Sequence, residues 1–475
     1  MGTIVEAFPY RPDSAQLFAS VASRPWAAFL DSCSPGCATG RFDVIAWEPR
    51  VTLQSRGEVT EIRCEGAARL SREDPFELLR RYLGPPVEAP GDLPFYGGAI
   101  GYFSYDLGRH IERLPATAAD PLGLPEMAVG IYDWALVVDH AEGRSWLVGR
   151  ADSPPGGRER LEAVARGGAG SPPPRFLVQG PLASNMDDAG YAERYQRVQR
   201  YIRDGDCYQI NLARRFSLAA NGDPWAAYCA LRRLSPAPFA AYLNTPAVQV
   251  LSSSPERFLR VSGGAVETRP IKGTRRRGLS PEEDRRLREE LAVSPKDRAE
   301  NLMIVDLLRN DLGRTCALGS IRVPSLFEVE SFANVHHLVS TVTGRLAPGE
   351  DALSLLRGCF PGGSITGAPK IRAMEIIEEL EGERRSVYCG SIGYLGFDGR
   401  FDGNIAIRTM IHAGGELRFW AGGGIVSDST CAEEAAEIAV KARAMREVAE
   451  RFRTEKDGSA LPKERQCQLW GVTGR

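Results

Sequence analysis

The chain has 475 residues, of which 43% are hydrophobic, so it is long enough to bury a large core and to form more than one domain. Its 59 basic and 61 acidic residues nearly cancel, which argues against binding to nucleic acid or to an anionic membrane surface. The ten cysteines are scattered without a CxxC pair, which argues against a disulfide framework and a structural zinc site. The N-terminal residues lack a basic region followed by an apolar run, and no segment is long and apolar enough to span a bilayer. We therefore expect a cytoplasmic protein with reduced thiols.

Composition divides the chain into four segments. Residues 1–151 contain short strand-like runs such as VTLQS and WALVVD, separated by glycine and proline. Residues 152–188 are rich in Pro, Gly and Ser, which predicts a linker of extended or turning backbone rather than packed elements. Residues 189–453 mix helical and strand-like patterns, and residues 454–475 form a polar tail that we expect to be loose.

Helix starts are marked clearly in the third segment. Apolar residues recur at helical spacing over about residues 189–204, and Gly205 can end that helix. Capping boxes begin at Ser280 and Thr430, and Ser294 followed by proline opens a helix to about Asp311. The helix that follows Thr430 is expected to run to about residue 453.

Strand-like runs cover about residues 208–218, 248–253, 257–261 and 266–271, and Gly263-Gly264 between the last two predicts a hairpin. Strands and helices do not alternate strictly. The pattern therefore predicts an α+β fold with largely antiparallel sheets.

Two predicted helices each carry two carboxylates one turn apart. Asp297 and Glu300 share a face of the first, and Glu434 and Glu437 share a face of the second. Facing acidic pairs are what a hard cation such as Mg²⁺ requires. The alternative is that these residues only complement the helix dipole, because acidic side chains are common in the first turn of a helix.

Two glycine-rich runs do not meet the requirements of a nucleotide site. Residues 362–370 read GGSITGAPK, but Ala368 and Pro369 stand where a phosphate loop has Lys and Ser or Thr. The run Gly422-Gly423-Gly424 lacks GxGxxG spacing. Their backbone N–H groups can still approach an anion such as a carboxylate, and turn-forming glycines remain the other interpretation.

Three further residues are candidates for catalysis. Lys272 lies at a glycine turn just before three arginines, and neighbouring cations or desolvation lower the pKa of an ammonium group and release a nucleophilic amine. Glu256 precedes a strand in the same region and can serve as a proton donor, and His337 follows His336 near a strand end. Each also has an ordinary structural interpretation. Lys272 can be a surface charge, Glu256 can belong to a surface ion pair, and His337 can be a hydrogen-bonded residue at a strand end.

Taken together, these segments resemble the chorismate-binding family. The resemblance rests on SSSPERF, RPIKGTRRRG, DRAENLMIVDLLRNDLGR, VHHLVSTVTG, FPGGSITGAPKIRAMEII, GSIGYLGFDG, NIAIRTM and WAGGGIVSDST, which follow in order over residues 191–451. PWAAFLDS, RFDVIAWEP and GGAIGYFSYDLGR are similar to the N-terminal region of the anthranilate and aminodeoxychorismate synthases of that family. The resemblance implies a sandwich of two large, mostly antiparallel sheets flanked by helices.

The resemblance also implies roles for individual residues. It assigns Glu300 and Glu437 as Mg²⁺ ligands, supported by Asp297 and Glu434, with Glu256 as general acid and His337 near the leaving hydroxyl. It places the following residues around the substrate chorismate: Gly273, Thr274, Ser364, Thr366, Tyr394, Arg408, Gly422, Gly423, Gly424 and Lys441.

Two positions indicate the branch of the family. The water-using isochorismate and salicylate synthases carry a lysine where CYQINLAR has Gln209, so ammonia is the expected nucleophile here. Anthranilate synthases have a small residue in PIAGT, whereas the Lys272 of PIKGT resembles aminodeoxychorismate synthase. In that branch the lysine attacks C2, expels the C4 hydroxyl, and is itself expelled when ammonia adds at C4.

The chain contains no GxCxG nucleophile motif of a glutaminase, so the resemblance implies a separate glutamine amidotransferase subunit as partner. Relatives hold tryptophan in an N-terminal pocket. Residues 29–32 and 41–43 fall in that region, and Asp31 stands where the regulatory pattern has glutamate, so tryptophan binding stays open. Anthranilate synthesis, a non-catalytic partner protein and a nucleotide-dependent transferase are the alternatives to aminodeoxychorismate synthesis.

Overall fold

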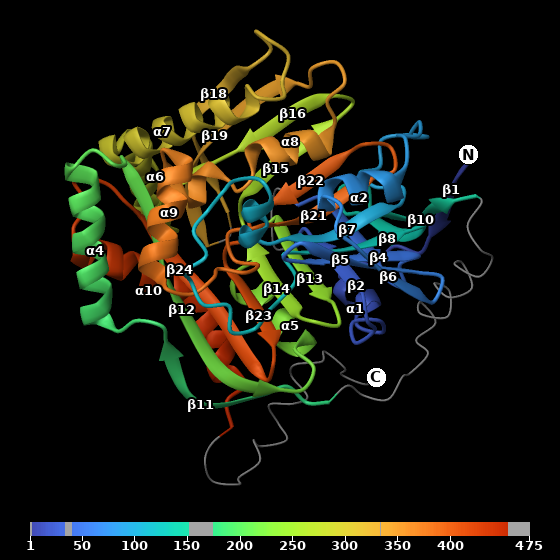
Figure 1. Ribbon diagram of the computed structural model, residues 1–475, viewed down its shortest axis with the longest axis horizontal. Coiled ribbons are helices and arrows are strands. Elements are labelled where there is room, and N and C mark those ends of the chain that lie inside the picture. Colours follow the sequence, from blue (N-terminus) through green and yellow to red (C-terminus); the bar gives the residue numbers. More distant parts are fainter. Residues whose placement is uncertain (1, 34–39, 152–173, 333, 455–475) are drawn as a thin grey trace.

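Two large antiparallel β-sheets form the centre of the molecule, and helices cover their outer surfaces (Figure 1). The computed structural model describes residues 2–33, 40–151, 174–332 and 334–454. Every pairing between its named strands is antiparallel, as predicted for an α+β protein of this kind.

The first sheet contains twelve strands. In spatial order they are β1 (Thr3–Phe8), β10 (Arg144–Arg150), β9 (Trp134–Asp139), β3 (Phe42–Ala46), β2 (Ala27–Asp31), β13 (Phe239–Asn244), β14 (Gln249–Ser254), β23 (Thr409–Ala413), β24 (Glu416–Ile425), β12 (Gln209–Asn221) and β11 (Leu177–Ser184), with β20 (Gly367–Ala368) beside β12.

The second sheet also has twelve strands. They are β17 (Ile271–Arg276), β19 (Val335–Arg345), β16 (Ala265–Arg269), β15 (Arg257–Ser262), β22 (Phe401–Asn404), β21 (Ser391–Gly396), β7 (Gly98–Phe103), β8 (Met127–Tyr132), β4 (Val51–Arg56), β5 (Val59–Cys64) and β6 (Ala67–Ser71), with β18 (Arg322–Ser331) beside β19.

Each sheet combines strands of the N-terminal region with strands of the C-terminal region. In the first sheet β2 pairs with β13, and in the second β7 pairs with β21. A strand without its neighbour exposes a row of unpaired N–H and C=O groups. The two regions distinguished by composition therefore complete the same sheets.

Side-chain caps fix the starts of several helices. The hydroxyls of Ser280 and Thr430 accept hydrogen bonds from backbone N–H groups three residues on, as the capping boxes predicted, and the hydroxyl of Ser294 does the same. The helices are α1 (Ala15–Phe18), α2 (Pro75–Leu83), α4 (Asp188–Arg203), α5 (Trp225–Leu234), α6 (Pro281–Val293), α7 (Pro295–Leu312), α8 (Ala352–Cys359), α9 (Lys370–Glu381) and α10 (Cys431–Arg451), with 3₁₀ turns η1 (Tyr105–His110) and η2 (Gly363–Ile365).

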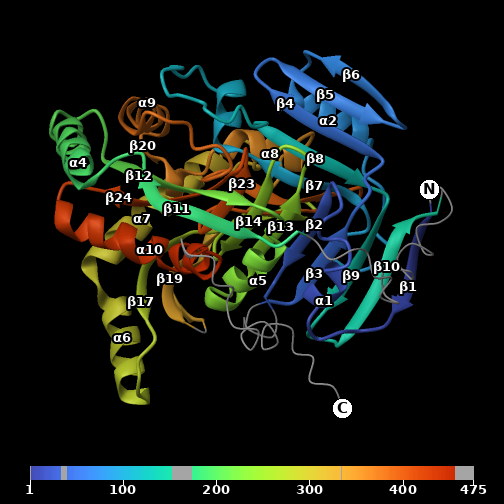
Figure 2. The ribbon, with the colours of Figure 1, turned by 90° about the horizontal axis from the view of Figure 1, so that it is seen from below.

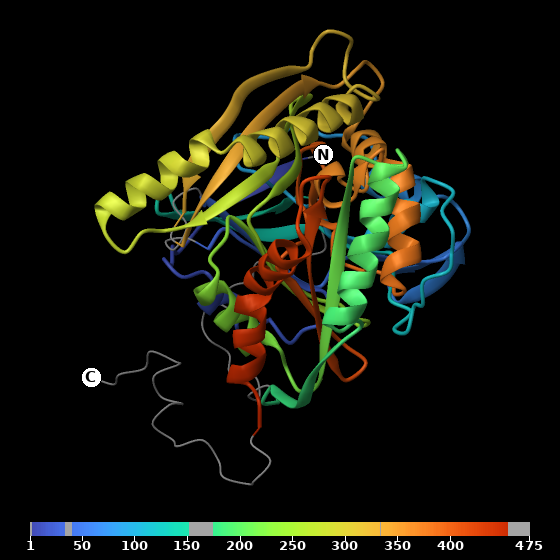
Figure 3. The same cartoon turned by 90° about the vertical axis from the view of Figure 1, so that its left-hand side faces the viewer.

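Two apolar clusters divide the interior. One contains buried side chains from both sheets, including Val51, Ile100 and Val250. Burial of this apolar surface between the sheets stabilises their packing against each other. The other lies under α4, α5, α9 and α10 and includes Phe29, Tyr228 and Ile438. Helices α4 and α9 lie side by side (Figures 1 and 3), whereas α6 extends away from the body (Figure 2) and buries Leu291 alone of its residues.

Part of the predicted linker, residues 177–184, is a β-strand. Residues 152–173 lie outside the described residues, but β11 forms within its second half and pairs with β12. Most of the predicted tail, residues 455–475, also lies outside the described part of the chain. Within the described residues, no helix combines the length and hydropathy needed to cross a bilayer.

Candidate active site

A cavity of about 1070 Å³ opens between helices α7 and α10 and strands β17, β19 and β24. Its lining contains most of the residues singled out in the sequence, although they come from distant parts of the chain. These are Glu256, Lys272, Gly273, Thr274, Asp297, Glu300, His337, Ser364, Arg408, Gly422, Gly424, Glu437 and Lys441.

Glu256 and Lys272 both contact Ser364, a residue of the 3₁₀ turn η2 that precedes β20. The hydroxyl of Ser364 donates to Oε1 of Glu256 over 2.8 Å, and the carbonyl oxygen of Ser364 accepts from Nζ of Lys272 over 3.1 Å. Burial raises the pKa of Glu256, although the positive charge of Lys272 acts in the opposite direction. A carboxyl group with a raised pKa is suited to donate a proton.

His337 is held as a neutral imidazole. It lies on β19 opposite Thr274 of β17, and its Nδ1 is 2.8 Å from Oγ1 of Thr274. Burial, together with the nearby charge of Arg408, lowers the pKa of His337 to about 3. His337 can therefore accept or donate a hydrogen bond near neutral pH but carries no charge there.

Arg408 also lines this cavity. Its side chain makes no hydrogen bond or ion pair within the described residues, and burial lowers its pKa, helped by Arg443. A desolvated guanidinium requires a negative partner. Its φ of 53° places it in the left-handed region, which is uncommon for a residue with a side chain.

The three consecutive glycines lie within β24 and not in a turn. A Cβ at Gly422, Gly423 or Gly424 would lie 2.6–2.8 Å from a buried polar atom of Asn211, Glu434 or Gln209, respectively. The close approach of these polar groups therefore requires glycine. Both amide atoms of Gln209, Oδ1 of Asn211 and Oε2 of Glu434 are buried without a hydrogen-bond partner in the described residues.

The four acidic residues come from two facing helices, and protein cations hold three of them. Arg275 lies 3.0 Å from Asp297, Lys441 2.6 Å from Glu437, and Lys296 4.0 Å from Glu434. Burial raises the pKa values of Glu300 and Glu434. Burial acts in the same direction on Glu437, but Lys441 and other lysines outweigh it and lower its pKa.

The donor set suits a hard divalent cation, although its groups are not assembled around one. Glu300, Glu437 and Asp297 line the cavity, and the unpartnered oxygen of Glu434 lies behind Gly423. Within the described ranges, no three His, Cys, Asp or Glu side chains converge into a ready metal site. Carboxylate oxygens without competing sulfur or imidazole ligands match the preference of Mg²⁺. The magnesium prediction therefore stays a prediction.

Comparisons with known proteins show the family. The family model described as "chorismate binding enzyme" matches residues 30–447. The chain belongs to the chorismate-binding enzyme family. It is 49% identical to "Aminodeoxychorismate synthase component 1" of Klebsiella aerogenes over 91% of this chain and 95% of that protein. It is 41% identical to "Anthranilate synthase component 1" of Thermus thermophilus over 89% of this chain and 91% of that protein.

Solved structures include a close match in fold. Anthranilate synthase component I from Streptococcus pneumoniae TIGR4 superposes with a TM-score of 0.75 at 32% identity, covering 85% of this chain and 93% of that one. The sandwich of two antiparallel sheets expected from the family resemblance is thus confirmed.

Besides Glu434, three predicted site residues lie outside the lining of the main cavity. Tyr394 on β21 does not line this main cavity; it lines a second cavity, because β21 lies four strands away from β19 in the second sheet. Thr366 is buried, and its hydroxyl donates to the carbonyl oxygens of Gly362 and Gly363. These hydrogen bonds stabilise the turn that contains Ser364. Gly423 faces Glu434 and not the cavity.

The sequence interpretation missed Tyr388. This residue lines the main cavity, and its ring stacks on Trp420 with centroids 5.9 Å apart. It lies six residues before Tyr394, and only the strand positions show that it is Tyr388 that reaches the main cavity. Lys296 and Arg443 line the cavity as well and were also missed.

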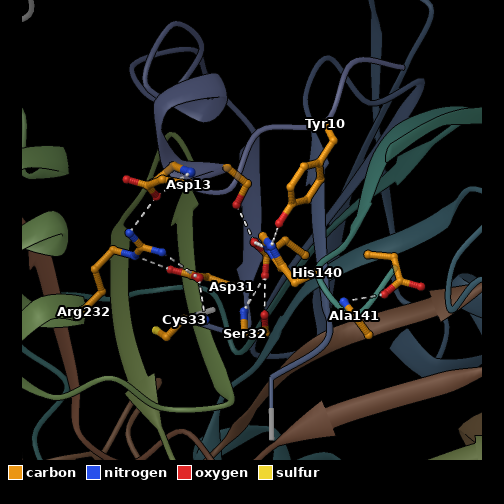
Figure 4. A network of polar contacts seen from close by, with 12 residues as sticks. Tyr10, Asp13, Asp31, Ser32, Cys33, His140, Ala141 and Arg232 are labelled. Carbon is orange, nitrogen blue, oxygen red and sulfur yellow. Dashed lines mark hydrogen bonds and ion pairs between the residues drawn. The ribbon is translucent and has the colours of Figure 1, made fainter. Parts of the chain in front are cut away.

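The second cavity has a volume of about 190 Å³, and its lining contains Asp31, Ser32, Arg41 and Phe42. These residues belong to the region in which relatives hold tryptophan. Figure 4 shows the polar network beside it. Arg232 of α5 pairs with Asp31 at 2.7 Å, and His140 lies 2.7 Å from Asp43. The two cavities share Pro255 and Ile271 as wall residues.

Proposed function

We propose that this protein is the synthase component that converts chorismate and ammonia to 4-amino-4-deoxychorismate, a step toward 4-aminobenzoate and folate. The observation that carries the proposal is the contact of Lys272 and Glu256 with one residue, Ser364, in the main cavity. A lysine beside a buried proton donor has the geometry for a covalent displacement. The relatives named aminodeoxychorismate synthase component 1 support the same reaction.

In this mechanism the neutral amine of Lys272 attacks C2 of the ring. The C2–N bond forms, the two ring double bonds shift, and the C4–O bond breaks while Glu256 gives its proton to the departing hydroxyl, which leaves as water. Ammonia then forms the C4–N bond, the double bonds shift back, and the C2–N bond breaks to return Lys272. The excess proton on the new amine restores Glu256.

The other residues bind and orient the substrate. The unpaired guanidinium of Arg408 is suited to the enolpyruvyl carboxylate, and neutral His337 can hold the C4 hydroxyl by a hydrogen bond. Glu300 and Glu437, with Asp297 and Glu434 in support, would hold Mg²⁺. Bound there, Mg²⁺ would neutralise the ring carboxylate.

Ammonia is proposed to come from a separate glutamine amidotransferase subunit in the cytoplasm. The "component 1" in the names of the relatives supports a partner component. Tryptophan is proposed for the second cavity, where Asp31 and Ser32 offer polar groups beside Phe42. Mass spectrometry of the denatured purified protein would detect retained tryptophan, and its absence would contradict this part.

The deciding experiment is to incubate the purified chain with chorismate, Mg²⁺ and ammonium at mildly alkaline pH and to identify the product by chromatography and mass. We expect aminodeoxychorismate, which an added lyase converts to 4-aminobenzoate. Anthranilate as the product would show that Lys272 does not block C2. No turnover, even with a cognate glutaminase subunit, would favour a non-catalytic partner protein.

A further inference from the structure

Arg443 is a cavity-lining cation without an acidic partner. It belongs to the stretch of α10 that borders the main cavity, and it is exposed, so it lies at the mouth of that cavity. Within the described residues its guanidinium makes no hydrogen bond and no ion pair. Glu447, one turn further along the helix, is at a spacing that allows pairing with Arg443, but Arg451 holds it at 2.9 Å.

Most other cations of the cavity wall are already engaged. Lys272 donates to the carbonyl oxygen of Ser364. Four more pair with carboxylates: Arg275 with Asp297, Arg276 with Glu283, Lys296 with Glu434 and Lys441 with Glu437. Among the residues that the structure describes, the wall therefore has two guanidinium groups without a negative partner, those of Arg408 and Arg443.

These two guanidinium groups act on each other. Burial lowers the pKa of Arg408, and the positive charge of Arg443 lowers it further, so the two side chains are close enough to repel. Two like charges that line one cavity are stabilised when an anion binds between them. Guanidinium N–H groups match the geometry of a carboxylate. The pair is therefore suited to receive one carboxylate from two sides.

We propose that Arg443 is the second guanidinium of the enolpyruvyl carboxylate subsite, which Arg408 binds from within and Arg443 from the mouth of the cavity. This inference rests on the proposed function for the identity of the substrate. It makes the subsite selective, because a ligand with only the ring carboxylate leaves both guanidinium groups unpaired. Arg443 binds substrate and takes no part in the displacement, so its loss should weaken binding and leave the chemical step nearly unchanged.

Two inhibitors that differ by one carboxylate test the proposal. The diacid meta-carboxymethoxybenzoate has a side-chain carboxylate that meta-methoxybenzoate lacks, and each inhibition constant against chorismate is measured at saturating Mg²⁺ and ammonium. For the wild type we expect the diacid to bind at least about tenfold more tightly. In Arg443→Gln this preference should fall about three- to tenfold, and KM for chorismate should rise by a similar factor with little change in kcat.

Arg446→Gln is the matched control. It removes an equal charge from an exposed position three residues further along α10, outside the cavity lining, and should match the wild type. If the wild type converts chorismate but Arg443→Gln keeps the full preference for the diacid, Arg443 does not bind that carboxylate and only this inference fails. If the wild type neither converts chorismate nor binds it, the proposed function fails together with the inference.

Discussion

The hydroxyl of Ser364 donates a 2.8 Å hydrogen bond to the buried carboxyl group of Glu256. The same residue accepts from Lys272 through its backbone carbonyl, so the proton donor and the nucleophile are held by one point of the loop. The active form of Glu256 in the proposed mechanism is the protonated one. Because burial raises its pKa, this form persists to higher pH than for an exposed glutamate.

Replacing Glu256 with glutamine is therefore expected to lower kcat about 10²- to 10⁴-fold with little change in KM, because the amide keeps the size of the side chain but carries no acidic proton. The wild-type profile of kcat/KM against pH should fall as pH rises through the pKa of Glu256, and this limb should be absent in the variant. His337 should add no limb near neutral pH, since its pKa is about 3. An unchanged kcat in Glu256→Gln would remove this residue from the mechanism.

Lys272→Ala should change the product as well as the rate. Without the amine, C2 is open to ammonia, so the small amount of aminated product should carry nitrogen at C2 instead of C4. We expect formation of aminodeoxychorismate to fall at least about 10²-fold. Chromatography and mass spectrometry with authentic standards would check this, with Arg309→Ala on the exposed side of α7 as the charge-removing control. Undiminished aminodeoxychorismate formation would exclude covalent catalysis by Lys272.

Two tyrosines provide a matched test of the site boundary. Tyr388 lines the main cavity and Tyr394 lines the second one. Tyr388→Phe is expected to raise KM for chorismate about 3- to 20-fold, which corresponds to the loss of one hydrogen bond. Tyr394→Phe should leave KM unchanged. The opposite pattern in steady-state kinetics would restore the role that the family resemblance gave to Tyr394.

A buried ion pair behind the site loop is expected to matter for stability. Arg385 pairs with Glu381 at 2.6 Å and donates to the carbonyl oxygens of Ile365 and Asn211. Arg385→Met should lower the free energy of unfolding by about 3–5 kcal/mol, because it leaves the Glu381 charge buried without its partner.

Urea unfolding followed by fluorescence would measure this loss. Arg385→Met combined with Glu381→Met should be less destabilised than Arg385→Met alone, although Ala213 N–H loses its acceptor. The exposed control Arg451→Met should keep the wild-type midpoint. A double variant as unstable as the single one would show that packing, and not the unpaired charge, determines the loss.

Local chemistry was readable from the sequence where single residues decide it. The caps at Ser280 and Thr430 predicted two helix starts, and Gly263-Gly264 predicted the hairpin of β15 and β16, which the structure confirms. Pairings over long distances were not readable, because strand order depends on burial of both faces and not on local pattern. The family resemblance named Tyr394, and Tyr388 was not considered, because only the strand positions show which tyrosine lines the main cavity. The cations on Asp297, Glu434 and Glu437 were also missed, since only the folded chain brings them within reach.

The mixed strand order has a consequence for engineering. A fragment that begins after residue 174 would lack β2 beside β13 and β7 beside β21, and both sheets would then end in open hydrogen-bonding edges. Such edges invite association between molecules. A chimaera that exchanges the first 150 residues with those of a relative must therefore preserve two interstrand registers at once. Its second cavity would combine residues of both parents, because Asp31 and Arg41 come from one side of the junction and Arg257 and Tyr394 from the other.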